Sequence, residues 1–205
     1  MPGLSDHREV VPESEVRGKE RSDEVQRSGM RDENKKRRML FITEIETPIG
    51  KLNAGASEEG VCFLEFGETK SVSRGKEFRQ GENRHLRKLR REIRDYFRGK
   101  RKEFSVPVAA EGTEFQKMVW SELVKIPFGS TISYSYLADR LGNKGLVRAA
   151  ANANSRNPAA ILIPCHRVIG ENGRLTGYAG GLWRKKWLLD HEKKQSGKPV
   201  DLQLF

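Results

Sequence analysis

After position 38, apolar residues first follow the pattern of short strands. Between residues 40 and 66, three short apolar runs are separated by segments that contain glycine. Such runs between turn residues predict strands at 40–45, 51–57 and 61–66, with turns at 47–50 and 58–60. The run at 61–64 is apolar on both faces, which is typical of a central strand. Cys62 in that run is most simply a small core residue.

The next apolar pattern has the period of a helix. Between residues 84 and 98, apolar side chains recur every three or four positions, at Leu86, Leu89, Ile93 and Phe97. Gly99 follows as a natural helix stop, and a final strand near 103–108 would close the unit. Residues 39–108 are therefore expected to form a small α/β domain with a three-stranded sheet and one helix.

Three further helices are predicted in the second half of the chain. The first carries apolar residues at helical spacing and is ended by Pro127-Phe128-Gly129, the apolar residues being Phe115, Val119, Leu123 and Ile126. Two shorter helices, at 133–141 and 145–155, flank Gly142-Asn143. Two short helices around a glycine-containing turn are the outline of a helix-turn-helix. The fold class is α+β: the small α/β domain precedes a mostly helical C-terminal domain over 109–195.

The two ends of the chain lack the apolar residues that a core needs. Residues 1–38 are rich in Arg, Glu, Ser and Asp, so burial cannot offset the entropy lost on ordering, and a disordered charged tail is expected. Residues 196–205 are expected to form a C-terminal tail. The first tail ends in Lys35-Lys36-Arg37-Arg38, which is a nucleic-acid contact, a localisation signal or simply a solvated charge run.

Positive charge is concentrated in the middle of the chain. The 205 residues carry 39 Lys and Arg against 28 Asp and Glu, a net charge of +11. Residues 74–102 alone carry 13 basic and 4 acidic side chains. This concentration suggests a polyanionic partner. We expect Arg84, Arg87, Arg91 and Arg94 to contact phosphates or attract them at long range; the alternative is a solvated helix face that covers the sheet.

Several classes of protein are excluded by the same sequence. The longest apolar run, near Ala159–Pro164, is far shorter than the roughly 20 residues that a membrane span needs. The charged N-terminus does not resemble a secretory signal. Cys62 and Cys165 are too few for a disulfide framework, and no Cys/His cluster has zinc-ligand spacing. We therefore expect a soluble intracellular protein without a membrane partner, a metal or a cofactor.

A candidate nucleophile follows the apolar run. Cys165 comes after a strand-like segment and Pro164, so it is expected at a rigid turn. The neighbouring His166 and Arg167 are of the type that lowers a thiol pKa and favours the thiolate. The alternative is an inert buried cysteine. Because adjacent side chains on an extended backbone point apart, His166 is expected to act through a bridging water.

The motif Pro164-Cys165-His166-Arg167-Val168 resembles the active-site signature of the O6-alkylguanine-DNA alkyltransferases, the methylated-DNA–protein-cysteine methyltransferases. The resemblance covers about 112–192, and several other segments share it: Gly112–Gln116, Ile132–Tyr134, Val147–Ala149, Asn157-Pro158, Gly177–Gly181 and Lys185–Glu192. It implies direct repair of double-stranded DNA that contains O6-alkylguanine. The damaged base would be flipped out of the duplex. Its alkyl group would pass irreversibly to Cys165, once per molecule, without a cofactor.

The same resemblance implies roles for individual residues. Cys165 matches the alkyl acceptor, His166 the water-bridged base, Glu192 the carboxylate that orients it, and Asn157 the brace of the turn before the cysteine. Tyr134 matches the tyrosine that assists base extrusion and touches the guanine. Arg148 matches the arginine that fills the gap in the base stack. The remaining substrate or DNA contacts are expected from Asn152, Val168, Tyr178, Ala179 and Gly180. Ala151 and Ala179 depart from the glycine and serine found in some members.

Three other functions compete with this interpretation. A lesion-binding protein of the alkyltransferase-like kind would lack the acceptor, whereas Cys165 is present. A helix-turn-helix transcription factor would bind DNA whether or not it had the cysteine. A cysteine hydrolase would turn over many times and ignore DNA. The resemblance favours a monomer located with the DNA, in the cytoplasm or nucleoid of a prokaryote or the nucleus of a eukaryote.

Overall fold

A computed structural model describes residues 39–67 and 77–197. The predicted tail at 1–38, with its basic run, and residues 198–205 lie outside the described residues. No helix in the two described ranges is long and apolar enough to cross a membrane.

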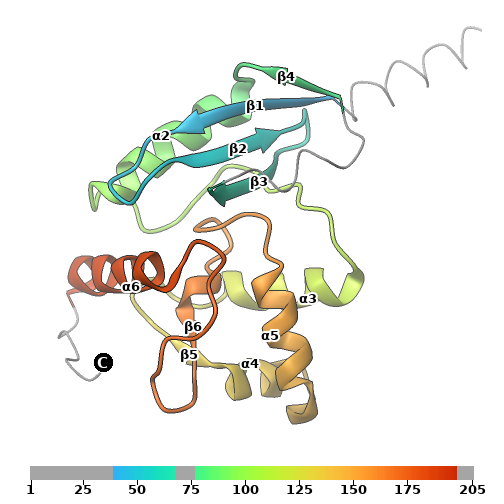
Figure 1. The fold of residues 1–205 in the computed structure, drawn as a ribbon, viewed down its shortest axis with the longest axis vertical. Coiled ribbons are helices and arrows are strands. Elements are labelled where there is room, and N and C mark those ends of the chain that lie inside the picture. The colour runs from blue at the N-terminus through green and yellow to red at the C-terminus, as the bar shows by residue number, and fades with distance from the viewer. Residues whose placement is uncertain (1–38, 68–76, 198–205) are drawn as a thin grey trace, which may run out of the picture. The chain divides into compact units, whose positions relative to one another are not determined.

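The first part of the fold is a sheet with one helix packed on it (Figure 1). The sheet has four strands in the order β3-β2-β1-β4. β1 (Leu40–Ile45) and β2 (Leu52–Ala56) are antiparallel, as are β2 and β3 (Val61–Phe66). β4 (Phe78–Gln80) pairs with β1 in parallel. The three predicted strands and their turns are confirmed.

The strand expected near 103–108 is wrong, and so is the count of three strands. The backbone N–H groups of Ser105 and Val106 donate to the buried carboxylate of Glu92, and Pro107 has no N–H to donate. Only Val108 makes an isolated bridge, with Val61. The fourth strand is instead β4, whose three side chains are all exposed, so no apolar pattern marked it.

The expectation of a central strand at 61–64 is also wrong, because β3 lies at the edge of the sheet. Its free edge is covered by the second half of the chain: the Leu64 N–H donates to Pro158 O, and Ala160 N–H donates to Leu64 O, both at 2.8 Å. That cover explains why the strand is apolar on both faces. Cys62 is half-buried rather than a core residue.

The predicted helix at 84–98 is confirmed as α2 (Arg84–Phe97). It begins where the Asn83 side chain accepts hydrogen bonds from the N–H groups of His85 and Leu86, and it ends before Gly99, whose φ is 69°. Its apolar face lies on β1, β2 and β3, and four of its side chains are fully buried: Leu86, Leu89, Ile93 and Tyr96.

The second part of the fold is mostly helical, so the α+β class is confirmed (Figure 1). Its helices are α3 (Glu114–Val124), α4 (Tyr134–Arg140), α5 (Val147–Ser155) and α6 (Leu182–Ser196). The first two residues of the predicted third helix, 145–146, belong instead to a 3-10 turn, Lys144–Leu146. α4 and α5 pack on each other, and α3 packs on α5. Two short parallel strands, β5 (Ile132–Ser133) and β6 (Val168–Ile169), join this part.

Candidate active site

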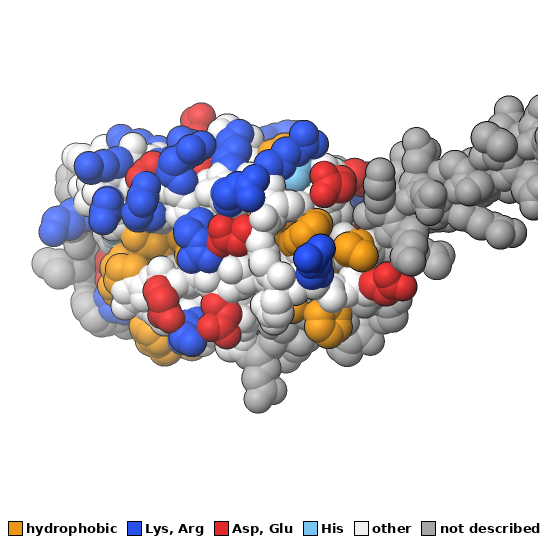
Figure 2. Space-filling view, turned by 90° about the horizontal axis from the view of Figure 1, so that it is seen from above, with side chains coloured by type: hydrophobic (Ala, Val, Ile, Leu, Met, Phe, Trp, Pro, Cys, Tyr) orange, Lys and Arg blue, Asp and Glu red, His pale blue; other side chains and the backbone are white. Residues whose placement is uncertain are grey.

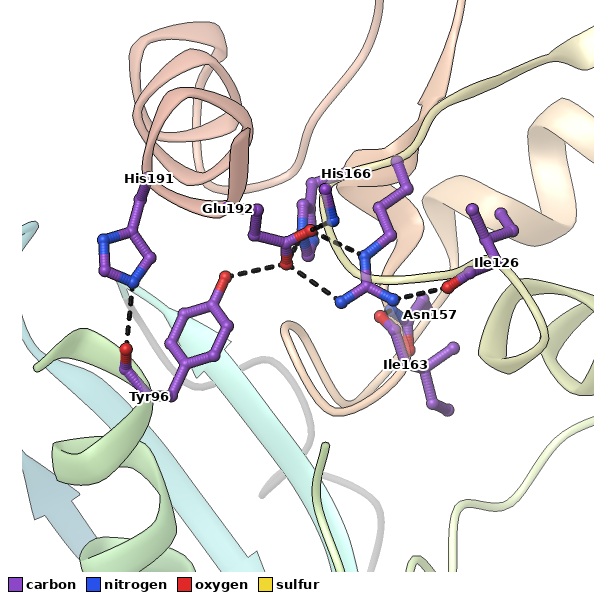
Figure 3. A network of polar contacts seen from close by, with 9 residues as sticks. Tyr96, Ile126, Asn157, Ile163, His166, His191 and Glu192 are labelled. Carbon is purple, nitrogen blue, oxygen red and sulfur yellow. Dashed lines mark hydrogen bonds and ion pairs between the residues drawn. The ribbon is translucent and has the colours of Figure 1, made fainter. Parts of the chain in front are cut away.

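The segment before Cys165 is a turn and not the expected strand-like run. Ile161 has a φ of 73°, a left-handed conformation that β-branched residues rarely adopt. Asn157 holds the turn on both sides, because its Nδ2 donates to Ile163 O at 2.7 Å and its Oδ1 accepts from the Ala159 N–H at 2.9 Å (Figure 3). The turn therefore fixes the backbone that leads into Cys165 by local hydrogen bonds.

Cys165 begins a single 3-10 turn, Cys165–Arg167, and its side chain is buried at the wall of a cavity of about 560 Å³. The cavity is lined by β3, the start of α3, the 154–158 segment and the 177–180 loop. Burial raises the pKa of the Cys165 thiol, while Asn157 and the positive charge of Lys185 act to lower it. At neutral pH the resting group is therefore a thiol.

The expected lowering of the thiol pKa by His166 and Arg167 is not found, because burial outweighs the groups that act to lower it. Both side chains instead hydrogen-bond to Glu192, which lies on α6, and Figure 3 shows His166 beside that carboxylate. The ring Nε2 of His166 lies 2.8 Å from Glu192 Oε1, and both side chains are fully buried. Burial lowers the pKa of His166, so its ring is neutral at pH 7. Within the described residues, His166 Nδ1 is buried and makes no hydrogen bond.

Glu192 accepts hydrogen bonds from four residues in three separate parts of the chain. Besides His166, Arg167 donates twice, from Nε to Oε2 at 2.8 Å and from Nη2 to Oε1 at 2.9 Å. Tyr96 of α2 donates its hydroxyl to Oε1 at 2.9 Å, and the Gly129 N–H donates to Oε2 at 3.1 Å. Burial alone would raise the pKa of Glu192, but His166 and Arg167 hold it well below its usual range. Glu192 is therefore a fixed anion.

This fixed charge assigns the tautomer of His166. A carboxylate only accepts hydrogen bonds, so the imidazole proton lies on Nε2 and the lone pair on Nδ1. Nδ1 is the nitrogen without a partner among the described residues. The arrangement can therefore take up a proton at Nδ1, and Glu192 would stabilise the resulting imidazolium.

Lys185 of α6 is a buried cation that the sequence analysis did not single out. It is fully buried, and its Nζ donates to Val168 O and to Thr176 O, both at 2.7 Å. Burial lowers its pKa to about 8, while Cys165 acts to raise it. Lys185 thus ties β6 to the loop that contains Tyr178. The side chain of Val168 is fully buried and does not line the cavity.

The loop 177–180 forms one wall of the cavity, and it includes the expected residues Tyr178, Ala179 and Gly180. The Tyr178 hydroxyl is buried without a partner among the described residues. Gly180 lies so close to Phe66 of β3 that an added Cβ would sit 2.8 Å from the ring. Arg184 Nη1 donates to Gly180 O at 2.7 Å, which holds this wall in place.

The residues expected to contact DNA fall into two groups. Tyr134, at the start of α4, is partly buried; burial raises its pKa, and its hydroxyl interacts with Thr176 and Asn154. Arg148 and Asn152 are exposed one turn apart on α5, and neither lines the cavity. Asn152 Oδ1 accepts from Arg156 Nε at 3.0 Å. The structure thus gathers Cys165, His166, Glu192 and Asn157 at one centre and leaves α5 as a separate exposed surface.

Two family descriptions match the two parts of this fold. Residues 40–110 match the "6-O-methylguanine DNA methyltransferase, ribonuclease-like domain", and residues 114–194 match the "6-O-methylguanine DNA methyltransferase, DNA binding domain".

Curated relatives match about three quarters of the chain. The methylated-DNA–protein-cysteine methyltransferase of Methanosarcina acetivorans is 42% identical over 153 residues, which is 75% of this chain and 98% of the relative. The constitutive enzyme of that name from Bacillus subtilis is 38% identical over 161 residues, 76% of this chain and 96% of the relative.

Solved structures lead to the same family. The O6-methylguanine methyltransferase of Mycobacterium tuberculosis superposes with a TM-score of 0.69 at 39% identity, over 80% of this chain and 98% of that one. A structure of the same organism's protein in complex with DNA superposes with a TM-score of 0.68, over 82% and 99%. With two family domains matched in order and relatives covered nearly end to end, the chain belongs to the methylated-DNA–protein-cysteine methyltransferase family.

Proposed function

We propose that Cys165 of this protein accepts the alkyl group of an O6-alkylguanine flipped out of duplex DNA, and that each molecule reacts once. The observation that carries the proposal is the arrangement of one buried thiol beside a neutral imidazole whose other nitrogen is held by a fixed carboxylate. The acceptor opens onto a cavity of about 560 Å³, which is large enough for a nucleobase. Because a thioether does not react with water, the product is permanent.

The first step of the proposed reaction is removal of the thiol proton. Its pKa is raised by burial, so the base has to be close and properly protonated. His166 Nδ1 is the base, and a water bridges it to Sγ because the two side chains leave the backbone in different directions. Glu192 stabilises the imidazolium, and the four groups that donate to it keep it ionised and in position.

The second step is an in-line displacement at the alkyl carbon. The bond from Sγ to carbon forms as the bond from carbon to guanine O6 breaks, and the electron pair of that bond leaves with the guanine. The base needs a proton or a strong hydrogen bond to depart as neutral guanine. Tyr134 supplies the hydrogen bond: its raised pKa keeps the hydroxyl protonated. The thiol proton that His166 took up balances the charge when it returns to guanine through solvent.

The α4–α5 pair is the proposed DNA surface. Arg148 is exposed on α5, where it can enter the base stack as the damaged nucleotide leaves it. Asn152 lies one turn further along the same face. One copy of the chain contains every group that the reaction uses, so a monomer suffices, working in whichever compartment holds the DNA.

Intact mass spectrometry tests the proposal. The full chain is mixed with a duplex that carries one O6-methylguanine, beside the Cys165→Ala and Cys62→Ala variants. We expect one methyl per protein, saturating at one equivalent, in the wild type and in Cys62→Ala, and no gain in Cys165→Ala. Cys62 is the matched control because it lines the same cavity on β3. Methylation of Cys165→Ala would refute the assignment, and tight lesion binding without transfer would indicate a damage sensor.

A further inference from the structure

The largest concentration of charge on the described residues lies outside the active site, on α2 and the five residues that follow it. Residues 84–102 carry ten Lys or Arg and two Asp or Glu, a net charge of +8 out of +11 for the whole chain. These two carboxylates pair with only three of the ten basic side chains: Glu92 with Lys88 at 4.0 Å and with Arg101 at 3.6 Å, and Asp95 with Arg94 at 3.8 Å. Glu92 is buried and occupied by Ser105 and Val106.

Five exposed arginines form a single row along this helix, which we call the arginine stripe: Arg84, Arg87, Arg91, Arg94 and Arg98. Their spacing of three or four residues places them on one face, opposite the apolar face that packs on the sheet. Of the five, only Arg94 has an ion pair among the described residues. Figure 2, the view from the end that carries the sheet and α2, shows Lys and Arg side chains gathered on this face.

Such a row is unfavourable for the helix that carries it. Like charges three or four residues apart repel each other, and a cation in the first turn opposes the helix dipole. The first turn of α2 has no acidic residue. A helix face that is only solvated requires neither a row of like charges nor a cation in the first turn. A polyanion placed along the row would relieve both unfavourable interactions. All five residues are arginine, whose fork binds phosphate oxygens in pairs.

The dimensions of the stripe fit a nucleic-acid backbone. Fourteen residues of helix extend about 21 Å at 1.5 Å per residue. A duplex presents about one phosphate charge per 1.7 Å of axis, so about twelve lie along that length. Five guanidinium groups at intervals of about 5 Å can therefore each meet a phosphate without any base being read.

The stripe and the proposed DNA surface lie in different parts of the fold. α2 packs on β1, β2 and β3, whereas α5 packs on α3 and α4. Within residues 39–197, Figure 1 shows α2 at the sheet end and α4 and α5 at the opposite end. We infer that the arginine stripe of α2 binds the phosphates of a second segment of duplex DNA while α5 holds the first. The inference rests on the proposed function only for the identity of the surface that holds the first duplex.

A bridging experiment tests the inference with the full chain. One 20-base-pair duplex carries O6-methylguanine and a donor dye, and an undamaged one carries an acceptor dye. Energy transfer between the dyes should rise with added wild-type protein. The triple variant Arg87→Gln/Arg91→Gln/Arg94→Gln should lose this transfer, and the salt slope for the second duplex should fall by about 2.7 on a log–log plot, at about 0.9 per lost contact.

The matched control is Lys51→Gln/Lys117→Gln/Lys125→Gln, which removes the same charge from exposed lysines away from α2. It should bridge like the wild type, and both variants should still gain one methyl per protein. Bridging that survives in the stripe variant, or that is lost equally in the control, overturns the inference. So does a stripe that binds phosphatidylserine vesicles but no second duplex. Loss of methyl transfer in the wild type would instead refute the proposed function.

Discussion

The hydroxyl of Tyr96 tests whether the sheet half of the molecule positions the catalytic groups of the helical half. Tyr96 lies on α2, is fully buried, and donates to Glu192 Oε1, the same oxygen that faces His166 Nε2 (Figure 3). The substitution Tyr96→Phe removes this one donor. It keeps the ring, which packs against Phe97, Phe104 and Phe128.

The expected loss of stability follows from the charge on the acceptor. A hydrogen bond to a charged group contributes about 1.5–3 kcal/mol to the free energy of unfolding. Glu192 keeps four other donated bonds, two of them from Arg167, so it is not left unpaired. We therefore expect Tyr96→Phe to unfold more easily by an amount near the lower end, about 1.5 kcal/mol.

The expected effect on the reaction has a definite sign. With one donor gone, Oε1 carries more uncompensated negative charge and attracts the proton on His166 more strongly. The pKa of His166, which burial lowers in the wild type, therefore rises in the variant. His166 of the variant is therefore protonated at a higher pH than in the wild type, and a protonated His166 cannot act as a base. The acid limb of the alkyl-transfer rate shifts to higher pH as a result.

Two measurements test the predicted effects of Tyr96→Phe on stability and on the pH dependence of transfer. Urea unfolding gives the change in stability, and single-turnover methyl transfer between pH 5 and 8 gives the acid limb. Tyr136→Phe is the control, since its side chain is 53% exposed and its loss should change stability by less than about 0.5 kcal/mol. An acid limb that stays in place or moves to lower pH refutes the reasoning, and so does a Tyr96→Phe stability equal to the control's.

Three further predictions concern the base, the DNA surface and the cavity wall. Because burial lowers the pKa of His166, the rate of wild-type transfer should fall on the acid side with a midpoint below 6.5; a midpoint at or above pH 7 would contradict a neutral base. Arg148→Ala should slow transfer from duplex DNA at least tenfold, an effect of about 1.4 kcal/mol, but leave transfer from the free base within twofold; equal losses would place Arg148 in the chemistry. Gly180→Ala puts a methyl group against Phe66 and should slow transfer, and adding Phe66→Leu should restore part of the rate. If the second substitution restores nothing, contact with Phe66 is not the cause of the slower transfer.

Local patterns in the sequence were sufficient for the elements that they predicted correctly. The helix at 84–97 follows from its own apolar period, its Asn83 cap and Gly99, and the strands at 40–45, 52–56 and 61–66 follow from runs between glycine-containing turns. These features act over a few residues, so each element can be predicted from its own segment of the sequence. The expected strand at 103–108 failed because a distant carboxylate, Glu92, takes its N–H groups.

The active site, like the fold, was predicted only in part from the sequence. The Pro164-Cys165-His166 motif predicted the proposed acceptor and its proposed base, and a resemblance supplied Glu192. Nothing in the sequence showed that Arg167 would bind Glu192 in place of activating the thiol, or that Lys185 would be fully buried. Arg and Lys are exposed by default, and only the packed structure reveals which of them has partners that make burial possible.

By itself, then, the sequence determined the first three strands, the helices, the family and the candidate nucleophile, because period, turn chemistry and contiguous motifs are local. The tertiary structure alone decided the protonation states, because they depend on groups far apart in the chain. Tyr96 and Glu192 are 96 residues apart, yet they share a hydrogen bond in the interior. Burial and neighbouring charges set the pKa values of Cys165, His166 and Glu192, and both are created only when the chain folds.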